Sequence, residues 1–310
     1  MVFINNKQIF KVHLCTLGSG FRYLFHAYGM PLLVLLSTLM LSSGCSDISY
    51  RGYVTQDVAA ESNFNRKLVS GELFEHVVYE SHLDNIEKGT LKVYIEGDGL
   101  PWYRGRSPSG DPTPGEPLAL RLMAQDLTAA IYIGRPCYFG LNHSSNCTST
   151  IWTFARYSEE VIASMNRVVK QYQEILGITK VVLIGYSGGG VIATLMAKDI
   201  NLPTFLLTIS ANLDIDAWTT SRGFLPLDES LNPVDFIEQL QDIRQLHLIA
   251  VEDKTVPPFV TRLYTDKLPR LSSRQYPNFD HKCCWVSLWR QILRESPWSK
   301  PVGNNVESSL

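Results

Sequence analysis

One short segment constrains the fold of this chain more than any other: an apolar run that leads straight into a Gly-x-Ser-x-Gly turn. Residues 181–184 read Val-Val-Leu-Ile, and residues 185–189 read Gly-Tyr-Ser-Gly-Gly. Residues 191–200 then carry the apolar pattern of a buried helix. The order strand, tight turn, helix predicts that Ser187 stands on a sharp elbow, with its hydroxyl clear of the backbone.

Steric crowding explains why this turn contains glycine. Gly185, Tyr186 and Gly189 form the expected elbow around the serine, and the two glycines stand where strand and helix cross too closely for side chains. The motif alone is weak evidence, because roughly one chain in ten of this length carries it by chance. The apolar strand before it and the helix after it make the signal specific.

Composition indicates a globular protein and argues against nucleic acid as a partner. The 310 residues are 45% hydrophobic and 19% charged, and the formal net charge is −2. This balance suits a chain with a substantial core. Lysine and arginine form no run, so the sequence lacks the basic patch that is typical of nucleic-acid-binding proteins.

Short apolar segments alternate with helix-patterned segments along the chain. We expect strands at 73–79, 90–95, 130–133, 181–184, 205–210 and 246–251, and helices at 118–129, 158–175, 191–200, 261–267 and 285–293. Such alternation implies parallel strands joined by helical crossovers, and hence an α/β sheet covered on both faces. The polar, partly helical segment 211–242 is expected to form a short cap.

The N-terminal segment differs from the rest. Residues 1–44 contain three basic side chains and no acidic one, and residues 30–41 are uncharged and strongly apolar. A basic start, a short apolar core and small residues at its end are typical of a secretory signal. The apolar core is shorter than the roughly 20 residues that span a bilayer. Counted from residue 23 it is long enough, so an uncleaved anchor is the alternative.

The end of this segment, Leu-Ser-Ser-Gly-Cys at 41–45, resembles the lipobox of bacterial lipoproteins. In those proteins the cysteine is lipidated and becomes the mature N-terminus. Ser42 stands here where the lipobox usually has leucine, and Leu41 lies one place early. The resemblance implies lipidation of Cys45 and, with Ser46 after it, attachment to the outer membrane. The alternative is ordinary cleavage nearby and a soluble periplasmic or secreted protein.

Export would permit disulfide bonds. Cys137 and Cys147 lie ten positions apart in a loop-like stretch that a bridge would pin, whereas Cys283 and Cys284 are adjacent. Four cysteines follow Cys45, and they allow three pairings among which the sequence does not choose. No Cys/His spacing resembles a zinc site, and neither a metal nor a cofactor is implied.

A serine hydroxyl becomes a nucleophile only when a base accepts its proton and a carboxylate orients that base. After an elbow serine, the expected chain order is acid and then histidine. His247 and His281 are the histidines that follow Ser187. His247 lies inside an expected strand, so we interpret it as structural. His281 lies between a strand-like segment and a helix, which suits a base carried on a loop.

The acid should follow a strand end before His281. The stretch after the strand 246–251 supplies Glu252 and Asp253, and we favour Asp253, with Glu252 as the alternative. Asp253 also precedes Pro257 and can cap a helix there, a role that does not exclude catalysis.

Ser187, Asp253 and His281, in this order on an alternating α/β pattern, resemble the α/β-hydrolase superfamily. The Asp-x-x-Val-Pro run that begins at Asp253 resembles the pattern that commonly carries the acid there. The resemblance covers most of the chain after the signal. It implies an α/β-hydrolase fold with a mostly parallel sheet and a serine hydrolase that cleaves a carboxylic ester through an acyl-enzyme. An acyltransferase, an amidase or peptidase, and a catalytically silent envelope binding protein are the alternatives.

Acyl transfer also needs N–H donors for the oxyanion of the tetrahedral intermediate. One is expected from Gly188, directly after the nucleophile. The second is expected from the loop 96–99, Glu-Gly-Asp-Gly, where Asp98 is favoured and Gly99 is the alternative. Many members of the superfamily have His-Gly where this chain has Glu-Gly.

The expected organisation is a signal at 1–44, a tether at 45–67, one α/β-hydrolase catalytic domain at 68–300 and a flexible tail at 301–310. The expected partner is a small-molecule ester substrate, and no protein partner is implied. The polar content of the cap segment favours a small or partly polar ester over bulk triglyceride.

Overall fold

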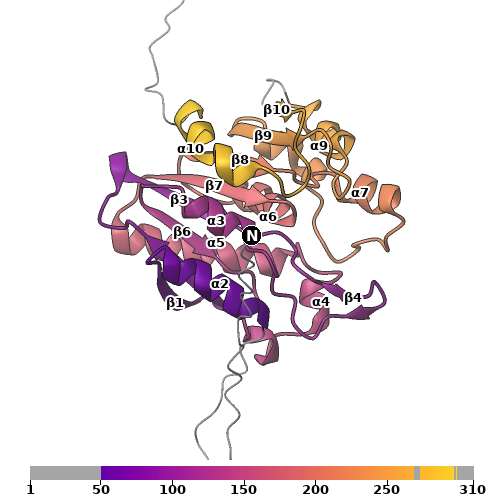
Figure 1. Cartoon of the computed structure of the whole chain (residues 1–310), viewed down its shortest axis with the longest axis horizontal. Coiled ribbons are helices and arrows are strands. Elements are labelled where there is room, and N and C mark those ends of the chain that lie inside the picture. Colours follow the sequence, from indigo (N-terminus) through magenta and orange to yellow (C-terminus); the bar gives the residue numbers. More distant parts are fainter. Residues whose placement is uncertain (1–49, 269–272, 297, 299–310) are drawn as a thin grey trace, which may run out of the picture. The chain divides into compact units, whose positions relative to one another are not determined.

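The computed structural model describes residues 50–268, 273–296 and 298 (Figure 1). The predicted signal, Cys45 and the predicted tail lie outside these residues. The strands of the described part are β1 (Asn65–Ser70), β2 (Glu75–Ser81), β3 (Thr90–Ile95), β4 (Trp102–Tyr103), β5 (Ser107–Pro108), β6 (Ala130–Ile133), β7 (Lys180–Tyr186), β8 (Thr204–Ile209), β9 (Arg244–Ala250) and β10 (Ser273–Tyr276). The helices are α2 (Tyr50–Glu61), α3 (Leu118–Met123), α4 (Ser149–Trp152), α5 (Glu159–Leu176), α6 (Gly188–Ala197), α7 (Ile215–Arg222), α8 (Ile237–Leu240), α9 (Pro258–Thr265) and α10 (Trp285–Glu295), with 3₁₀ turns at η1 (Glu87–Gly89), η2 (Leu141–His143) and η3 (Pro233–Phe236).

The described strands form an eight-stranded sheet in the order β1-β2-β6-β3-β7-β8-β9-β10, with β4 and β5 as a separate small hairpin. The six strands from β6 to β10 in this order run parallel to one another. β2 is antiparallel to both β1 and β6. The predicted α/β sheet is confirmed, and β7, which leads to Ser187, lies in its interior.

Alternate residues of each strand supply the two faces of the sheet, as the period of two in a strand requires. In β3, Leu91 and Val93 join the core on one face, and Tyr94 joins the core on the other. Residues of α5 and α6 complete the first core, and residues of α2, α3 and α10 complete the second. Figure 1 shows α2, α3 and α10 on the near side of the sheet and α5 and α6 behind it.

The predicted tether at 45–67 is wrong over its described part, because residues 50–61 form α2 and β1 begins at Asn65. Val58 and Ala59 of α2 are buried in the core under α3 and α10. The apolar residues of α2 do not gather on one helical face. The spacing of apolar residues in the sequence therefore did not indicate a helix here. The folded domain therefore includes residues before 68.

The predicted cap, 211–242, contains α7, η3 and α8. The α7 helix begins where the Asp214 carboxylate accepts the N–H of Ala217 at 3.0 Å, and it ends at Gly223, whose φ of 64° suits a helix C-terminus. Asp214 and Gly223 thus mark the two ends of a helix of about two turns, so the cap stays short.

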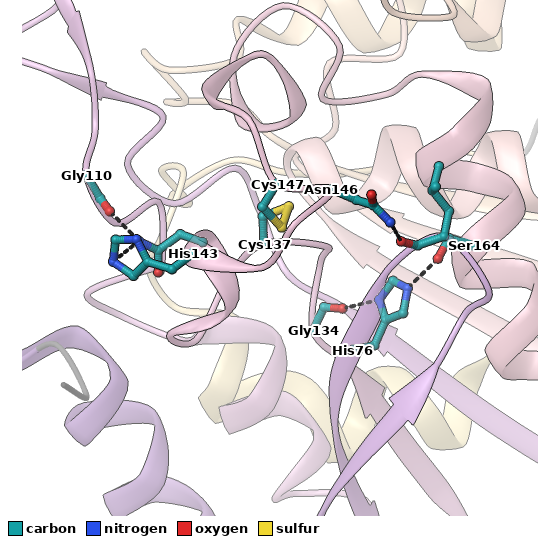
Figure 2. The surroundings of a disulfide bond; sticks show 10 residues. His76, Gly110, Gly134, Cys137, His143, Asn146, Cys147 and Ser164 are labelled. Atoms are coloured by element: carbon teal, nitrogen blue, oxygen red, sulfur yellow. Dashed lines mark hydrogen bonds between the residues drawn. A yellow bond between two sulfur atoms is a disulfide. The ribbon is translucent and has the colours of Figure 1, made fainter. Parts of the chain in front are cut away.

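The structure pairs Cys137 with Cys147 and Cys283 with Cys284. Figure 2 shows the first bridge closing the loop after β6, beside hydrogen bonds that hold the same region. His76 Nδ1 donates to the Gly134 carbonyl, and His76 Nε2 accepts from the Ser164 hydroxyl, both at 2.8 Å. These contacts tie β2, the loop after β6 and α5 together.

Among the described residues, none of the helices is both long enough and apolar enough to cross a bilayer.

Candidate active site

The predicted elbow is present between β7 and α6. Ser187 has φ 53° and ψ −126°, a conformation that non-glycine residues rarely adopt. A Cβ on Gly185 would collide with the backbone of Gly189, and a Cβ on Gly189 would collide with the backbone of Ile95. The glycines of the motif are therefore required by the close approach of the helix to the two strands.

The structure brings the three predicted residues together although they are far apart in the sequence. His281 Nε2 lies 3.1 Å from Ser187 Oγ, and His281 Nδ1 lies 2.7 Å from Asp253 Oδ2. A carboxylate only accepts hydrogen bonds, so Nδ1 carries the proton and Nε2 is left to accept from the serine hydroxyl. The arrangement can therefore remove the proton of Ser187.

Asp253 uses its two carboxylate oxygens for different tasks. Oδ2 faces His281, while Oδ1 accepts the backbone N–H groups of Thr255 and Val256, each at 2.8 Å. The side chain is buried, whereas the alternative acid Glu252 is exposed. Asp253 is thus both a turn cap and the partner of the histidine, and Glu252 is not in the constellation.

The other candidates lie elsewhere. His247 is buried in β9, where its ring nitrogens face Thr208 Oγ1 at 2.8 Å and Gln245 Oε1 at 3.1 Å. Burial lowers the pKa of His247 to about 3, so it stays neutral in the core. Asp280 accepts the backbone N–H groups of Lys282 and Cys283, which shapes the loop that carries the base.

The two residues predicted to supply oxyanion donors are Gly188 and Asp98, and they follow β7 and β3. Gly188 is the first residue of α6, so its N–H has no acceptor within the helix. The loop after β3 passes directly beside the serine, since a Cβ on Gly97 would lie 3.2 Å from Ser187 Cβ. Within the part of the chain that the structure describes, no acceptor is recorded for the N–H of Asp98.

Sequence reasoning missed the side chain of Asp98. Its carboxylate pairs with both Arg135 and Arg156 and accepts the Tyr157 hydroxyl, while its carbonyl accepts the Tyr138 hydroxyl at 2.8 Å. Burial opposes ionisation of this carboxyl, yet the charges of Arg156 and Arg135 hold its pKa at about 2. The ionised carboxylate therefore anchors the loop that passes beside Ser187.

Glu96 anchors the start of the same loop. Its two oxygens accept the backbone N–H groups of Gly97 at 3.2 Å and Ala119 at 2.9 Å, the latter near the start of α3. Burial raises the pKa of Glu96 to about 8, although these hydrogen bonds lower it. Glu96 is thus a buried acid that ties the loop to α3.

Ser187 and His281 open into a pocket of about 980 Å³. Its apolar wall includes Trp102, Phe154, Trp218 and Phe224, and its charged lining residues include Arg106 and Lys282. A pocket of this size suits a small-molecule ligand. Among the described residues, no group of three or more His, Cys, Asp or Glu side chains is placed to hold a metal ion.

No protein-family model matches the chain. Among curated proteins, a 3-oxosteroid 1-dehydrogenase of Mycolicibacterium smegmatis is 27% identical over 128 residues, which are 41% of this chain. The alignment spans 22% of that dehydrogenase, so this chain corresponds to about a fifth of its length. A match this short and this distant shows no family.

Solved structures give a consistent likeness. Est1E from Butyrivibrio proteoclasticus, solved with ferulic acid bound, superposes with a TM-score of 0.54 at 13% identity, over 74% of this chain and 98% of Est1E. The Pyrococcus furiosus esterase Pf2001 gives a TM-score of 0.53 at 10% identity, over 76% and 92% of the two chains. These overlaps are consistent with the mostly parallel sheet flanked by helices. The chain has the α/β-hydrolase fold.

The fold explains how remote residues meet. In this α/β-hydrolase fold, Ser187 follows β7, Asp98 follows β3, Asp253 follows β9 and His281 follows β10. These strands run parallel to their neighbours in one sheet, so their carboxyl ends lie at the same edge. The candidate site is assembled at that edge.

Proposed function

We propose that this protein is a serine hydrolase that cleaves a carboxylic ester through an acyl-enzyme. The observation that carries the proposal is the unbroken hydrogen-bonded series from Ser187 Oγ through His281 to Asp253, placed at a strained elbow. Structural packing alone does not require a serine with such dihedral angles to face a histidine that a buried carboxylate orients.

In the proposed mechanism, His281 Nε2 accepts the proton of Ser187 while Oγ attacks the ester carbonyl carbon. The carbonyl oxygen becomes an oxyanion that accepts the N–H groups of Gly188 and Asp98. The imidazolium then protonates the departing alcohol, which leaves an acyl group on Ser187. A water molecule, deprotonated by His281, releases the acid and restores the serine. Asp253 holds Nδ1–H throughout.

In this proposal the two N–H groups stabilise the oxyanion because they are held in place before the charge develops. Removal of one such donor costs about 2.7–4 kcal/mol of transition-state stabilisation in comparable sites. The ion pairs of Asp98 with Arg135 and Arg156 serve this purpose here, since they fix the loop that carries the second donor. That one similar structure, Pf2001, is named as an esterase supports the choice of an ester over other acyl compounds.

The test is labelling of the purified protein with a fluorophosphonate, which reacts covalently with activated serines. Wild-type protein should be labelled, and Ser187→Ala should not. Ser210→Ala is the matched control, because Ser210 is a buried serine just after the neighbouring strand β8 and lies outside the pocket. Labelling that persists in Ser187→Ala, or folded wild-type protein that is never labelled, would contradict the proposal.

A further inference from the structure

Two pairs of aromatic rings line the pocket beside Ser187. Trp102 and Phe154 meet edge to face with ring centroids 5.3 Å apart, and Trp218 and Phe224 meet likewise at 5.4 Å. The first pair belongs to β4 and the segment after α4, and the second to α7 and the residues after it. Figure 1 shows β4, α4 and α7 at the same end of the sheet.

The aromatic wall is held in place but incompletely covered. The indole N–H of Trp218 donates to the Thr255 carbonyl at 2.9 Å, which fixes the ring of the cap helix. Phe224 is nevertheless 50% exposed, and its neighbour Leu225 is 65% exposed; both line the pocket. Apolar surface of this kind next to a reactive centre gains free energy when a ligand covers it. Aromatic edges and faces favour a flat ring as that ligand.

The charges at the pocket are not balanced. Four basic side chains line it, and two of them have partners: Arg156 pairs with Asp98, and Arg121 pairs with Glu116. Arg106 and Lys282 have no carboxylate within salt-bridge distance among the residues that the structure describes.

Asp280, the acid nearest to Lys282 in the sequence, accepts the backbone N–H of Lys282 and does not pair with its ammonium group. Two positive charges thus remain at the pocket for an anionic group of a ligand.

From these contacts we infer that the substrate is an ester of a ring-bearing compound that also carries a negatively charged group. The ring lies against the two aromatic pairs, and the anionic group faces Arg106 and Lys282. This inference rests on the proposed function and narrows its substrate class. A flexible, uncharged acyl chain neither stacks on the aromatic pairs nor pairs with the charges of Arg106 and Lys282.

Three methyl esters test the inference with one leaving group that carries no ring: the hexanoate, the 4-methylbenzoate and the 4-carboxybenzoate, with the released acid followed by titration. Each kcat/KM is divided by the rate of hydroxide-catalysed hydrolysis, which removes intrinsic reactivity. We expect this normalised kcat/KM to be about fivefold higher for the methylbenzoate than for the hexanoate, because contacts between aromatic rings contribute a free energy of that order. We expect the normalised kcat/KM of the carboxybenzoate to be about threefold higher than that of the methylbenzoate at low salt. High salt should remove this difference, because it screens the attraction between charges.

Variants assign each preference to its residues. Phe224→Ala should lower the ring preference about fivefold, whereas Phe259→Ala should not, because Phe259 is similarly exposed on α9 but lies outside this pocket. Arg106→Met should remove the advantage of the carboxylate. Its matched control is Arg104→Met, since Arg104 lies over the Tyr103 ring, 5.1 Å from its centroid, and does not line the pocket.

Fluorophosphonate titration of Ser187 separates the two proposals. If the serine is labelled but the hexanoate is hydrolysed as well as the ring esters, or the carboxylate brings no advantage, the substrate inference is overturned and the hydrolase remains. If the folded protein is neither labelled nor active on any of the three esters, the proposed function fails, and the substrate inference fails with it.

Discussion

At the scale of single residues, the candidate site depends on carboxylates that each serve two purposes. Asp253 caps a turn with one oxygen and orients His281 with the other. Asp98 is the proposed second oxyanion donor through its backbone N–H, while its side chain is held by two arginines. Sharing one residue between structure and chemistry fixes its position closely, because moving it costs hydrogen bonds at both ends.

Asp253→Asn tests the proposed role of the acid. The amide no longer fixes Nδ1–H on the imidazole, so His281 can adopt the tautomer that cannot accept the serine proton. We expect kcat for an activated ester to fall by about 10³–10⁴-fold. Glu252→Gln is the control, since the neighbouring carboxylate is exposed and does not contact His281. Equal losses in both variants would contradict the assignment of Asp253.

Asp98→Asn tests the anchoring of the oxyanion loop. The change leaves the guanidinium groups of Arg135 and Arg156 without their carboxylate, and both are buried. Breaking a buried pair from one side costs about 3–5 kcal/mol of unfolding free energy. Glu116→Gln removes the exposed pair with Arg121 and should cost under about 1 kcal/mol. Urea unfolding measures both; similar small losses would contradict the anchoring role.

At the scale of elements, the loop after β6 connects strand β2 to the site. The Cys137–Cys147 bridge closes the loop, and Arg135 and Tyr138 within the same stretch contact Asp98. His76 of β2 holds the start of the loop through the Gly134 carbonyl (Figure 2). Contacts made at β2 therefore continue, through this loop, to Asp98.

The His76 contact makes stability depend on pH. Burial lowers the pKa of His76 to about 4, from 6.5 in an exposed histidine. The unfolded chain therefore binds the proton more readily than the folded one between these values, so stability is complete above pH 6.5 and is lost as pH falls toward 4. The shift corresponds to roughly 3 kcal/mol for this group.

Urea unfolding at pH 7 and pH 4 measures the effect. His76→Gln, which keeps a donor and an acceptor, should lose less unfolding free energy between the two pH values than the wild type. His143→Gln is the control, because His143 is exposed beside the same loop. A pH dependence in His76→Gln equal to that of the wild type would rule out His76 as its source.

At the scale of the whole molecule, the folded domain begins before residue 68, at α2, and the described chain continues to residue 298. We propose that the preceding segment directs export and that Cys45 carries the lipid anchor, because a basic, apolar and small-residue pattern ends at that cysteine. A ring-bearing, anionic ester would then be hydrolysed in the cell envelope.

Metabolic labelling of the full chain with an alkyne fatty acid in a bacterial host tests this proposal. Wild-type protein should take up the label, and Cys45→Ser should not. Cys15→Ser should be labelled like the wild type, because that cysteine precedes the expected cleavage point. An unlabelled wild-type protein recovered in the periplasm would favour ordinary signal cleavage.

The sequence by itself determined the local chemistry. Strand, turn and helix at 181–200 predicted the elbow, because glycine spacing and apolar periodicity are properties of neighbouring residues. The alternation of strands and helices predicted the parallel sheet, and chain order after Ser187 selected Asp253 and His281. Helix α2 and the edge strand β1 were missed, because their residues are placed by packing and carry no clear period.

Only the tertiary structure decided the contacts between remote residues. It placed Asp98 between Arg135 and Arg156, paired the cysteines, and brought the aromatic residues of β4 and α7 to one pocket. No local pattern marks such partners, since they meet through the folding of segments that are tens of residues apart. Burial then decided which carboxyls and histidines are charged, because desolvation depends on the atoms that surround a group in three dimensions.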